Sequence, residues 1–184
     1  RSRPELAVLL AYAKLSAFED LIASKVPDDP YFADELDRYF PDEIRRRFPD
    51  AVTEHRLRRE IIATQLSNIV VNRCGPGAMA RFADETGADV PTIALAYAAT
   101  RDSFGLLDLN GAIDLLDARL PGAVQVALYA AVQDVLVGRM AWFLRNTDLT
   151  SGLGPLVARF RQGVEAARLA VATALPAEFA RERD

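Results

Sequence analysis

The sequence has little of the chemistry that metal centres require. Its 184 residues include one histidine, His55, and one cysteine, Cys74. A zinc site built from cysteine and histidine needs several such ligands at fixed spacing, and a di-iron bundle needs Glu-x-x-His helices, a motif that the sequence lacks. These absences exclude both kinds of metal site, and a single cysteine excludes an internal disulfide.

His55 and Cys74 also fail as a catalytic pair. A nucleophile and its base must lie within hydrogen-bond reach, whereas 19 positions along one helix separate two residues by about 28 Å. We expect His55 to be solvated or to cap a helix, and Cys74 to be a small core residue. Sparse cysteine also makes the cytoplasm the expected compartment.

Long apolar runs and an excess of positive charge are absent as well. The longest apolar run, Leu6–Ala13, has eight residues, and a bilayer-spanning helix needs about 20, so we expect no membrane partner. The net charge of −4 argues against nucleic acid, because a phosphate-backbone binder needs a concentrated cationic surface. The chain starts at Arg1 without a signal-peptide pattern, and we expect it to be a piece of a larger protein.

Strand signals are missing, and helix signals recur in their place. We find no convincing alternation of apolar and polar residues and no Asn-Gly or Asp-Gly hairpin turn. Ser2 and Glu5 form an S-x-x-E capping box, and Asp29 followed by Pro30 is typical of a helix start. The sequence predicts helices over 5–24, 31–40, 41–48, 55–74, 76–86, 89–104, 108–116, 121–146 and 155–175.

These signals predict the fold class. We expect an all-α protein, a multi-helix bundle of about eight or nine helices with no significant sheet. Connections are short and no low-complexity linker interrupts them. The prediction is a single helical domain over 1–184, which a boundary near 105–120 could subdivide.

The segment 69–80, IVVNRCGPGAMA, offers a nucleotide-binding hypothesis. Gly75, Gly77 and Ala80 have the G-x-G-x-x-[G/A] spacing of a dinucleotide turn. That turn must follow a strand and open a helix, but only three consecutive apolar residues precede it, and helix-forming sequence continues up to Gly75. We expect Gly75 to end a helix in the left-handed conformation. A small NAD-binding enzyme built on this segment is a competing hypothesis that requires strands.

Arginines are concentrated between residues 45 and 59, where acidic residues are interleaved with them. We expect a salt-bridged, solvated surface, with an acidic docking partner as the alternative. The arginines are Arg45, Arg46, Arg47, Arg56, Arg58 and Arg59.

Three amides share one side of the predicted helix over 55–74. Gln65, Asn68 and Asn72 fall within an arc of about 60° at 100° per residue. Because apolar residues occur on every side of this helix, we expect the amides to be buried and therefore hydrogen-bonded. They either fix the packing of neighbouring helices or contact something outside the chain.

Several segments together resemble one known family. They are RPELAVLLAYAKL at 3–15, VPDDPY at 26–31, RYFP at 38–41, HRLRREIIATQLSNIVVNRCG at 55–75 and FADETGA at 82–88. The chain resembles the C-terminal helical region of the large bacterial NAD-dependent glutamate dehydrogenases. The resemblance is strongest over 3–117, is most specific over 58–68, and fades after about residue 146.

The resemblance implies a function for the full-length enzyme. That family deaminates L-glutamate to 2-oxoglutarate and ammonia and reduces NAD, with the lysine-rich substrate site and the NAD-binding domain lying in its catalytic core. Neither Lys14 nor Lys25, the only lysines here, matches the catalytic lysine motif. We therefore expect no catalytic, cofactor-binding or metal-binding residue in this chain, and NAD only in the full-length enzyme.

The function predicted in this way is a non-catalytic C-terminal domain, inactive by itself, that packs against the catalytic core or supports assembly and regulation. The expected partners are the catalytic domains of the same polypeptide, in a homo-oligomer. A self-contained helical interaction module with a groove between helices is the alternative. The structural or interdomain candidates are Arg58, Arg59, Glu60, Gln65, Asn68, Asn72 and Arg73.

Overall fold

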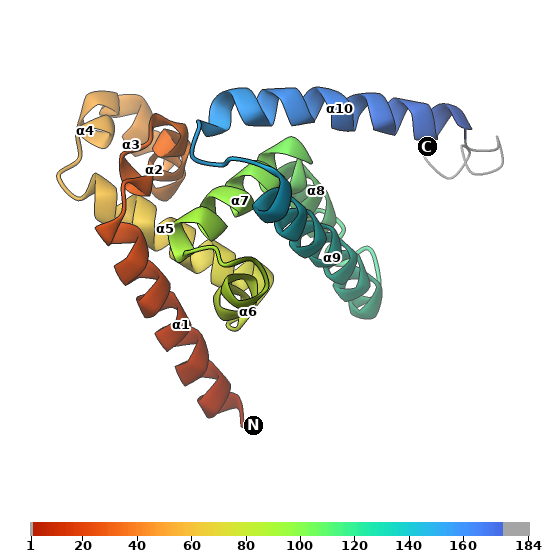
Figure 1. The fold of residues 1–184 in the computed structure, drawn as a ribbon, viewed down its shortest axis with the longest axis horizontal. Coiled ribbons are helices and arrows are strands. Elements are labelled where there is room, and N and C mark those ends of the chain that lie inside the picture. The colour runs from red at the N-terminus through yellow and green to blue at the C-terminus, as the bar shows by residue number, and fades with distance from the viewer. Residues whose placement is uncertain (1, 175–184) are drawn as a thin grey trace.

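The computed structural model describes residues 2–174, and this part of the chain is helical without any strand (Figure 1). The all-α prediction is confirmed. The α-helices are α1 (Arg3–Ala23), α2 (Ala33–Tyr39), α3 (Asp42–Arg47), α4 (Pro49–Thr53), α5 (Arg58–Cys74), α6 (Ala78–Thr86), α7 (Val90–Ser103), α8 (Leu106–Asp114), α9 (Gly122–Asn146) and α10 (Leu153–Ala174). Two 3₁₀ turns, η1 (Val26–Asp28) and η2 (Pro30–Phe32), connect α1 to α2.

Local capping explains where several helices begin. The Ser2 backbone N–H donates to Glu5 Oε2 at 2.6 Å ahead of α1, as the capping box predicts. Asp89 Oδ1 accepts from the Thr92 N–H at 2.9 Å and starts α7. These contacts satisfy backbone groups that a helix terminus leaves free.

The glycine-rich segment ends a helix and does not form the strand-to-helix turn that the nucleotide-binding hypothesis requires. α5 runs without a break to Cys74, where a dinucleotide turn would need a strand. Gly75 follows with φ 91° and ψ 161°. Its φ is positive, as predicted, but its ψ lies outside the left-handed helical region, in a conformation open essentially to glycine. Gly77 then precedes α6.

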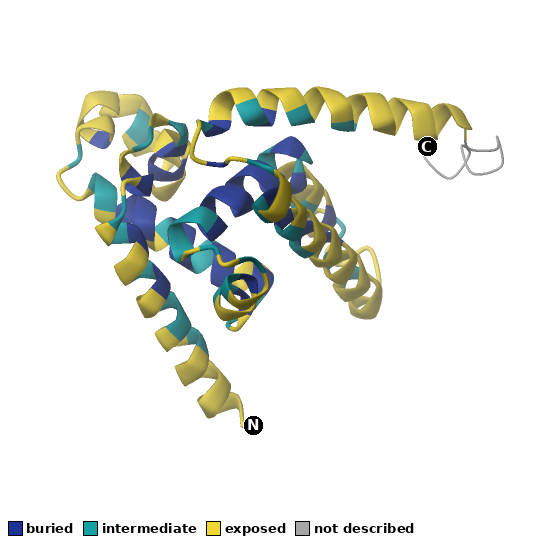
Figure 2. Cartoon of the chain, viewed as in Figure 1, coloured by how far each residue is buried: buried dark blue, intermediate teal, exposed yellow. Residues whose placement is uncertain are grey.

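The core lies on two faces of α7, which contacts α1, α5, α6, α8, α9 and α10. Nearly every residue of α7 after Thr92 is buried (Figure 2). One apolar cluster joins α7 to α1, α5 and α10 through residues such as Leu21, Ile62 and Val157. The other joins it to α5, α6, α8 and α9 through residues such as Phe82 and Met140.

An aromatic group at the junction of α9 and α10 fixes the start of the last helix. Phe160 lies edge-on to Phe143, with ring centroids 4.9 Å apart, and to Trp142 at 5.6 Å. Such edge-to-face pairs are favourable beyond the area that they bury. They hold the first turns of α10 on α9.

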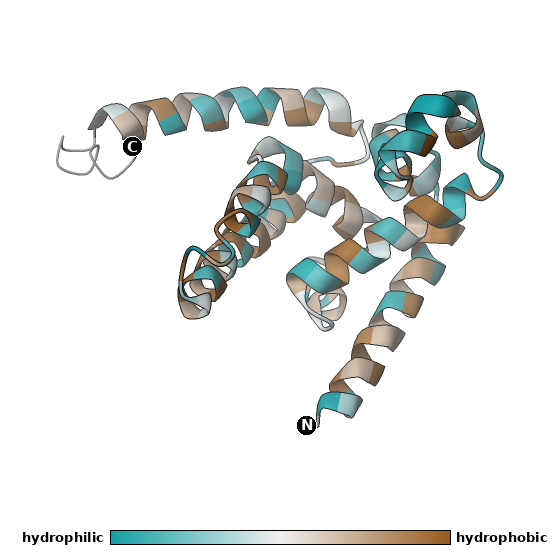
Figure 3. Ribbon diagram, turned by 180° about the vertical axis from the view of Figure 1, so that it is seen from behind, coloured by the Kyte–Doolittle hydropathy of each residue, from teal (hydrophilic) through white to brown (hydrophobic). Residues whose placement is uncertain are grey.

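The first turns of α1 and the second half of α10 extend away from the rest of the molecule (Figures 1 and 2). On α1, Val8 is 56% exposed and Tyr12 is 70% exposed, and apolar residues continue towards the N-terminal end (Figure 3). On α10, Leu169 is 69% exposed. Each of these helices is therefore covered at one end only.

The apolar stripe predicted for the last helix is covered over only part of its length. Leu156, Phe160 and Val164 are half-buried, whereas Ala167 and Val171 are exposed. The stripe's last member, Leu175, and the charged chain end lie outside the described residues.

Among the described residues, α9 is the one helix long and apolar enough to cross a bilayer by length and composition. The prediction of no membrane-spanning segment considered only unbroken apolar runs. α9 contains a few polar residues and still reaches the length and average apolar character of a membrane helix. Its buried residues Val132, Leu136, Met140 and Phe143 belong to the protein core. The core helix of a soluble protein passes the same test, so this is weak evidence for a membrane helix.

Candidate functional site

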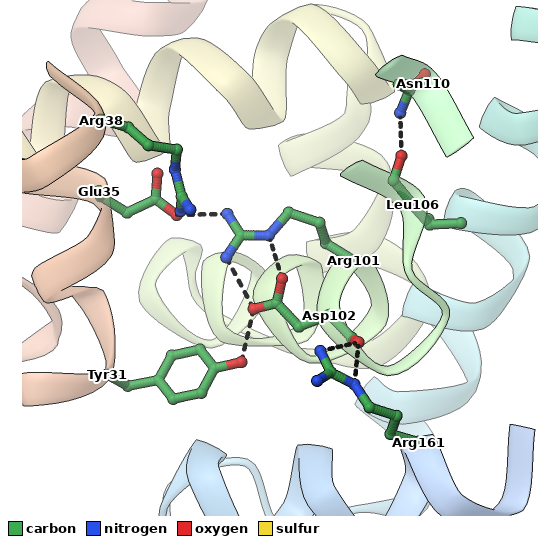
Figure 4. Close-up of polar contacts among 8 residues, drawn as sticks. All are labelled: Tyr31, Glu35, Arg38, Arg101, Asp102, Leu106, Asn110 and Arg161. Atoms are coloured by element: carbon green, nitrogen blue, oxygen red, sulfur yellow. Dashed lines mark hydrogen bonds and ion pairs between the residues drawn. The ribbon is translucent and has the colours of Figure 1, made fainter. Parts of the chain in front are cut away.

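The most polar part of the interior is a charged cluster between η2, α2, α7 and α10 (Figure 4). Its members are Tyr31, Glu35, Arg38, Arg101, Asp102 and Arg161. The cluster borders a cavity of about 370 Å³ that Asp34, Leu107 and Asp108 also line. These six residues are called the charged cluster.

Arg101 lies at the centre and uses both sides of its guanidinium. Its Nε donates to Asp102 Oδ1 at 2.6 Å and its Nη2 to Asp102 Oδ2 at 2.8 Å. Its Nη1 pairs with Glu35 Oε1. The side chains of Arg101 and Glu35 are 5% and 4% exposed, so this ion pair is buried and its charges depend on each other.

Three further contacts tie the helices together around this centre. Arg38 Nη2 donates to Glu35 Oε1 at 2.7 Å, and the Tyr31 hydroxyl donates to Asp102 Oδ2 at 2.6 Å. Arg161 Nη2 donates to the Asp102 carbonyl oxygen at 3.0 Å. The charged cluster therefore joins α2 and α10 to the central helix α7.

The electrostatics of the charged cluster keep Asp102 ionised and the Tyr31 hydroxyl protonated. Burial by itself raises the pKa of Asp102, but the hydrogen bonds and charge of Arg101 outweigh it and lower the pKa overall. Burial, and then the hydrogen bond to Asp102, raise the pKa of Tyr31. Both shifts move the pKa of the group away from neutral pH, where a general acid or base must exchange its proton. The arrangement suits positioning of helices rather than acid–base catalysis.

Metal-ligating side chains do not gather in the described part of the chain, which contains no group of three or more His, Cys, Asp or Glu placed to hold a metal ion. Cys74 is buried, with its Sγ 3.6 Å from Met140 Sδ, and burial raises the pKa of its thiol to about 12. His55 Nδ1 accepts from the Leu57 N–H at 3.2 Å. Cys74 is thus a core residue, as predicted. His55 is half-buried beside the Phe40 ring, and the N-cap of α5 is Leu57, so the expectation of a solvated or capping histidine is not confirmed.

Comparison with known proteins decides the family. The family model described as "Glutamate dehydrogenase, C-terminal" matches residues 2–184. The chain belongs to the glutamate dehydrogenase C-terminal family. The resemblance seen in the sequence is thereby confirmed.

Three proteins named NAD-specific glutamate dehydrogenase are similar to this member of the family. Identity is 44% over 143 residues to the protein of Halomonas elongata, 37% over 147 to that of Pseudomonas aeruginosa and 33% over 163 to that of Mycobacterium tuberculosis. The matches cover 78%, 79% and 89% of this chain. The chain spans only 9%, 9% and 10% of the length of these relatives.

The amides singled out in this glutamate dehydrogenase C-terminal domain are not buried, contrary to the sequence-based expectation. Gln65 and Asn68 are half-buried and Asn72 is exposed. Leu57, on the same side, is 55% exposed. The buried face of α5 is built from other residues, including Ile62, Ala63, Leu66, Val70 and Val71.

Among the predicted candidate residues, Arg59 has the clearest structural role. Its Nη2 donates to the carbonyl oxygens of Ile22 at 2.8 Å and Ser24 at 3.1 Å, and its Nη1 pairs with Asp28. A cation at the C-terminus of a helix satisfies free carbonyls and opposes the helix dipole. Arg59 therefore holds the end of α1 against α5.

The other candidates do not form one site. Arg58 is half-buried, with its Nε unpartnered among the described residues, and Glu60 is exposed. Arg73 is exposed and donates to Asn110 Oδ1 at 3.3 Å, near Asn72. The structure thus brings Asn72 and Arg73 together and leaves Arg58, Arg59 and Glu60 at the other end of α5.

The arginine-rich surface is salt-bridged, as the sequence predicts for its first part. Arg45 pairs with Asp42 and Arg46 with Glu43, each within α3. All four of these side chains are more than a third exposed, so their pairs contribute little stability.

Sequence reasoning missed the charged cluster. Its one readable signal is the Arg101-Asp102 dipeptide at the end of an otherwise apolar helix, because buried charges are rare unless paired. Glu35 lies among other acidic residues in the polar helix α2, where nothing distinguishes the one that is buried.

Proposed function

We propose that this chain is the C-terminal helical domain of a cytoplasmic, NAD-dependent glutamate dehydrogenase and packs against the catalytic domains of its own polypeptide. In the full-length enzyme those domains would convert L-glutamate and NAD to 2-oxoglutarate and ammonia. The names of the relatives and their roughly tenfold greater length support this proposal. The role proposed for the domain is packing and support of a homo-oligomeric assembly, without membrane or nucleic acid.

The observation that carries the packing role is the uncovered apolar surface at the N-terminal end of α1. Leu6, Val8, Leu9, Tyr12 and Leu15 are all exposed there. A contiguous apolar surface of this kind marks an interaction site, and an isolated helix gains little from propensity without a packed face. In this proposal, the catalytic domains of the same polypeptide pack against this surface of α1 and bury it.

Hydrogen exchange on the full-length enzyme tests this role. We expect the amides of residues 3–15 to exchange slowly in the full-length enzyme and rapidly in the isolated chain. A Val8→Asp/Tyr12→Asp double variant should lose that protection while the KM values for glutamate and NAD stay unchanged. Ser16→Asp, at an exposed polar position of the same helix, is the control and should keep the protection. Equal, fast exchange in the full-length enzyme and the isolated chain would contradict the proposal.

The mass of the native polypeptide separates this proposal from a self-contained interaction module. A polypeptide several times heavier than this chain's 20.2 kDa agrees with a domain of a large enzyme. A mass near 20.2 kDa would leave the interaction module. The isolated chain is also proposed not to bind NAD, and calorimetric titration with NAD measures this directly.

A further inference from the structure

A second cavity, of about 130 Å³, lies between α5, α7, α8 and α9, apart from the exposed surface of α1. Its inner residues are buried: Tyr97, Arg101, Leu106, Val132 and Leu136. Its outer residues are half-buried or exposed: Asn72, Arg73, Leu107, Asn110, Tyr129 and Gln133. The space equals that of several water molecules.

The lining of this cavity carries positive charge without a carboxylate. Arg73 and Arg101 are its charged members, and none of its described lining residues is acidic. Arg101 is already neutralised on its other side by Glu35 and Asp102. Arg73 forms no ion pair within the described part of the chain and shares a single hydrogen bond with Asn110. Its other guanidinium N–H groups are thus available to an anion.

The hydroxyl of a largely buried tyrosine opens onto the same space. Tyr97 is 3% exposed and lines the cavity, and no described group is hydrogen-bonded to its hydroxyl. Burial raises the pKa of Tyr97 above its usual range, so the hydroxyl stays protonated and can donate. A hydroxyl that makes no hydrogen bond within the described residues is free to donate to a ligand oxygen in the cavity.

Neighbouring contacts hold the entrance in place. Asn110 donates to the Leu106 carbonyl oxygen at 2.7 Å (Figure 4), and its Oδ1 accepts from Arg73. The Tyr129 hydroxyl donates to Asp114 Oδ1, outside the lining. Arg73 is therefore positioned from α8 before any ligand arrives, which lowers the entropic cost of binding.

We propose that this cavity binds the carboxylate group of a small aliphatic acid. Arg73 and Tyr97 donate to the carboxylate oxygens, and the short hydrocarbon part contacts Leu106, Val132 and Leu136. These apolar residues favour a carboxylic acid over inorganic phosphate, which has no apolar part to bury. The site does not depend on the packing role of α1.

Titration of the 184-residue chain with propionate, followed by two-dimensional amide NMR, tests the proposal. We expect saturable binding with a Kd on the order of 1 mM, typical for so few ligand atoms. The shifted amides should be those of α5, α7, α8 and α9 around the cavity. Propionamide, of the same shape without the charge, should bind about tenfold more weakly or not at all.

Variants assign the binding to the two donors. Arg73→Gln should weaken propionate about tenfold and Arg73→Lys less, because a lysine keeps the charge without the guanidinium geometry. Tyr97→Phe should weaken binding severalfold with an unchanged fold. Arg81→Gln removes an equal charge from an exposed position outside the lining and should leave the Kd unchanged.

Four results would overturn the proposal. They are no saturable propionate binding in the millimolar range, equal binding of propionamide, equal weakening by Arg81→Gln and Arg73→Gln, and binding of phosphate in preference to propionate. A failure of the hydrogen-exchange test on α1 leaves this site untouched. The two proposals are therefore tested independently of each other.

Discussion

Arg101 carries a full positive charge inside the protein with 5% of its side chain exposed. Removing one partner of a buried ion pair is strongly destabilising, because the remaining charge loses both water and its counter-charge. Arg38 bonds the same Glu35 oxygen but is 41% exposed. The two arginines therefore differ in burial while sharing a partner.

This difference gives the first prediction. Arg101→Leu should lower the free energy of unfolding by about 3–5 kcal/mol, since it leaves the carboxylates of Glu35 and Asp102 without their buried cation. Arg38→Gln should cost less than about 1 kcal/mol, because water replaces much of its contact. Urea unfolding measures both, and equal losses would show that burial does not set the energetics of the charged cluster.

Asp102 gives a prediction of pH dependence. Its pKa in the folded protein is lowered below the value of about 3.9 for an unfolded chain. Such a group stabilises the fold above the unfolded pKa, and the contribution is lost as pH falls through the folded pKa. We expect the difference in unfolding free energy between the native protein and Asp102→Asn to be constant near neutral pH. It should shrink below about pH 4, and a difference that stays constant into acid would be contrary to this expectation.

At the scale of helices, substitution of glycine by alanine should have opposite effects on stability at two positions. Gly75 ends α5 with φ 91° and ψ 161°, so Gly75→Ala should cost about 1–3 kcal/mol of backbone strain. Gly138 is exposed inside α9, and an added Cβ would meet nothing within 4 Å. Gly138→Ala should therefore stabilise by about 0.5–1 kcal/mol. Thermal unfolding of both variants checks the signs, and a stabilised Gly75→Ala would disagree with the helix-ending role.

Substitutions in the two halves of α10 should also differ in their effect on stability. Phe160 contacts Phe143 and Trp142, and Phe160→Ala should destabilise the isolated chain by about 2 kcal/mol. Leu169, exposed in the second half, should tolerate alanine within about 0.5 kcal/mol. Denaturant titration measures both, and a large effect at Leu169 would mean that this half is covered in solution.

Helix boundaries were predictable because their causes are local. Asp89 caps α7 through a backbone group three residues away, and Gly87 ends α6 at φ 72°. Which face of a helix is buried was less predictable. The amides of α5 looked buried because apolar residues surround them in sequence, but Leu57 on their side is exposed. Coverage depends on neighbouring helices, and the sequence of α5 does not contain them.

At the scale of the whole molecule, the candidate site was beyond sequence reasoning for a related reason. Arg101 and Glu35 are 66 positions apart, and nothing local to α2 marks Glu35 as the partner. Only the packing of α2 against α5 and of α5 against α7 brings them together. The family resemblance, in contrast, depended on short segments alone and needed no packing.

The uncovered end of α1 also predicts how the isolated chain behaves in solution. Exposed apolar residues such as Val8 and Tyr12 favour association when their natural cover is missing. We expect concentration-dependent self-association in sedimentation velocity, and Val8→Glu/Tyr12→Glu should reduce it. A chain that stays monomeric at all concentrations would argue against an interaction surface on α1.

Trp142 is the only tryptophan in the sequence, and it lies where α9 meets α10, against Phe143 and Phe160. The residue is 42% exposed, so the surroundings of its indole change if α10 leaves α9 or if another domain covers this junction. The protein thus carries a built-in fluorescent reporter at one defined place. Emission colour and quenching by a soluble quencher would follow the docking of the last helix without any added label.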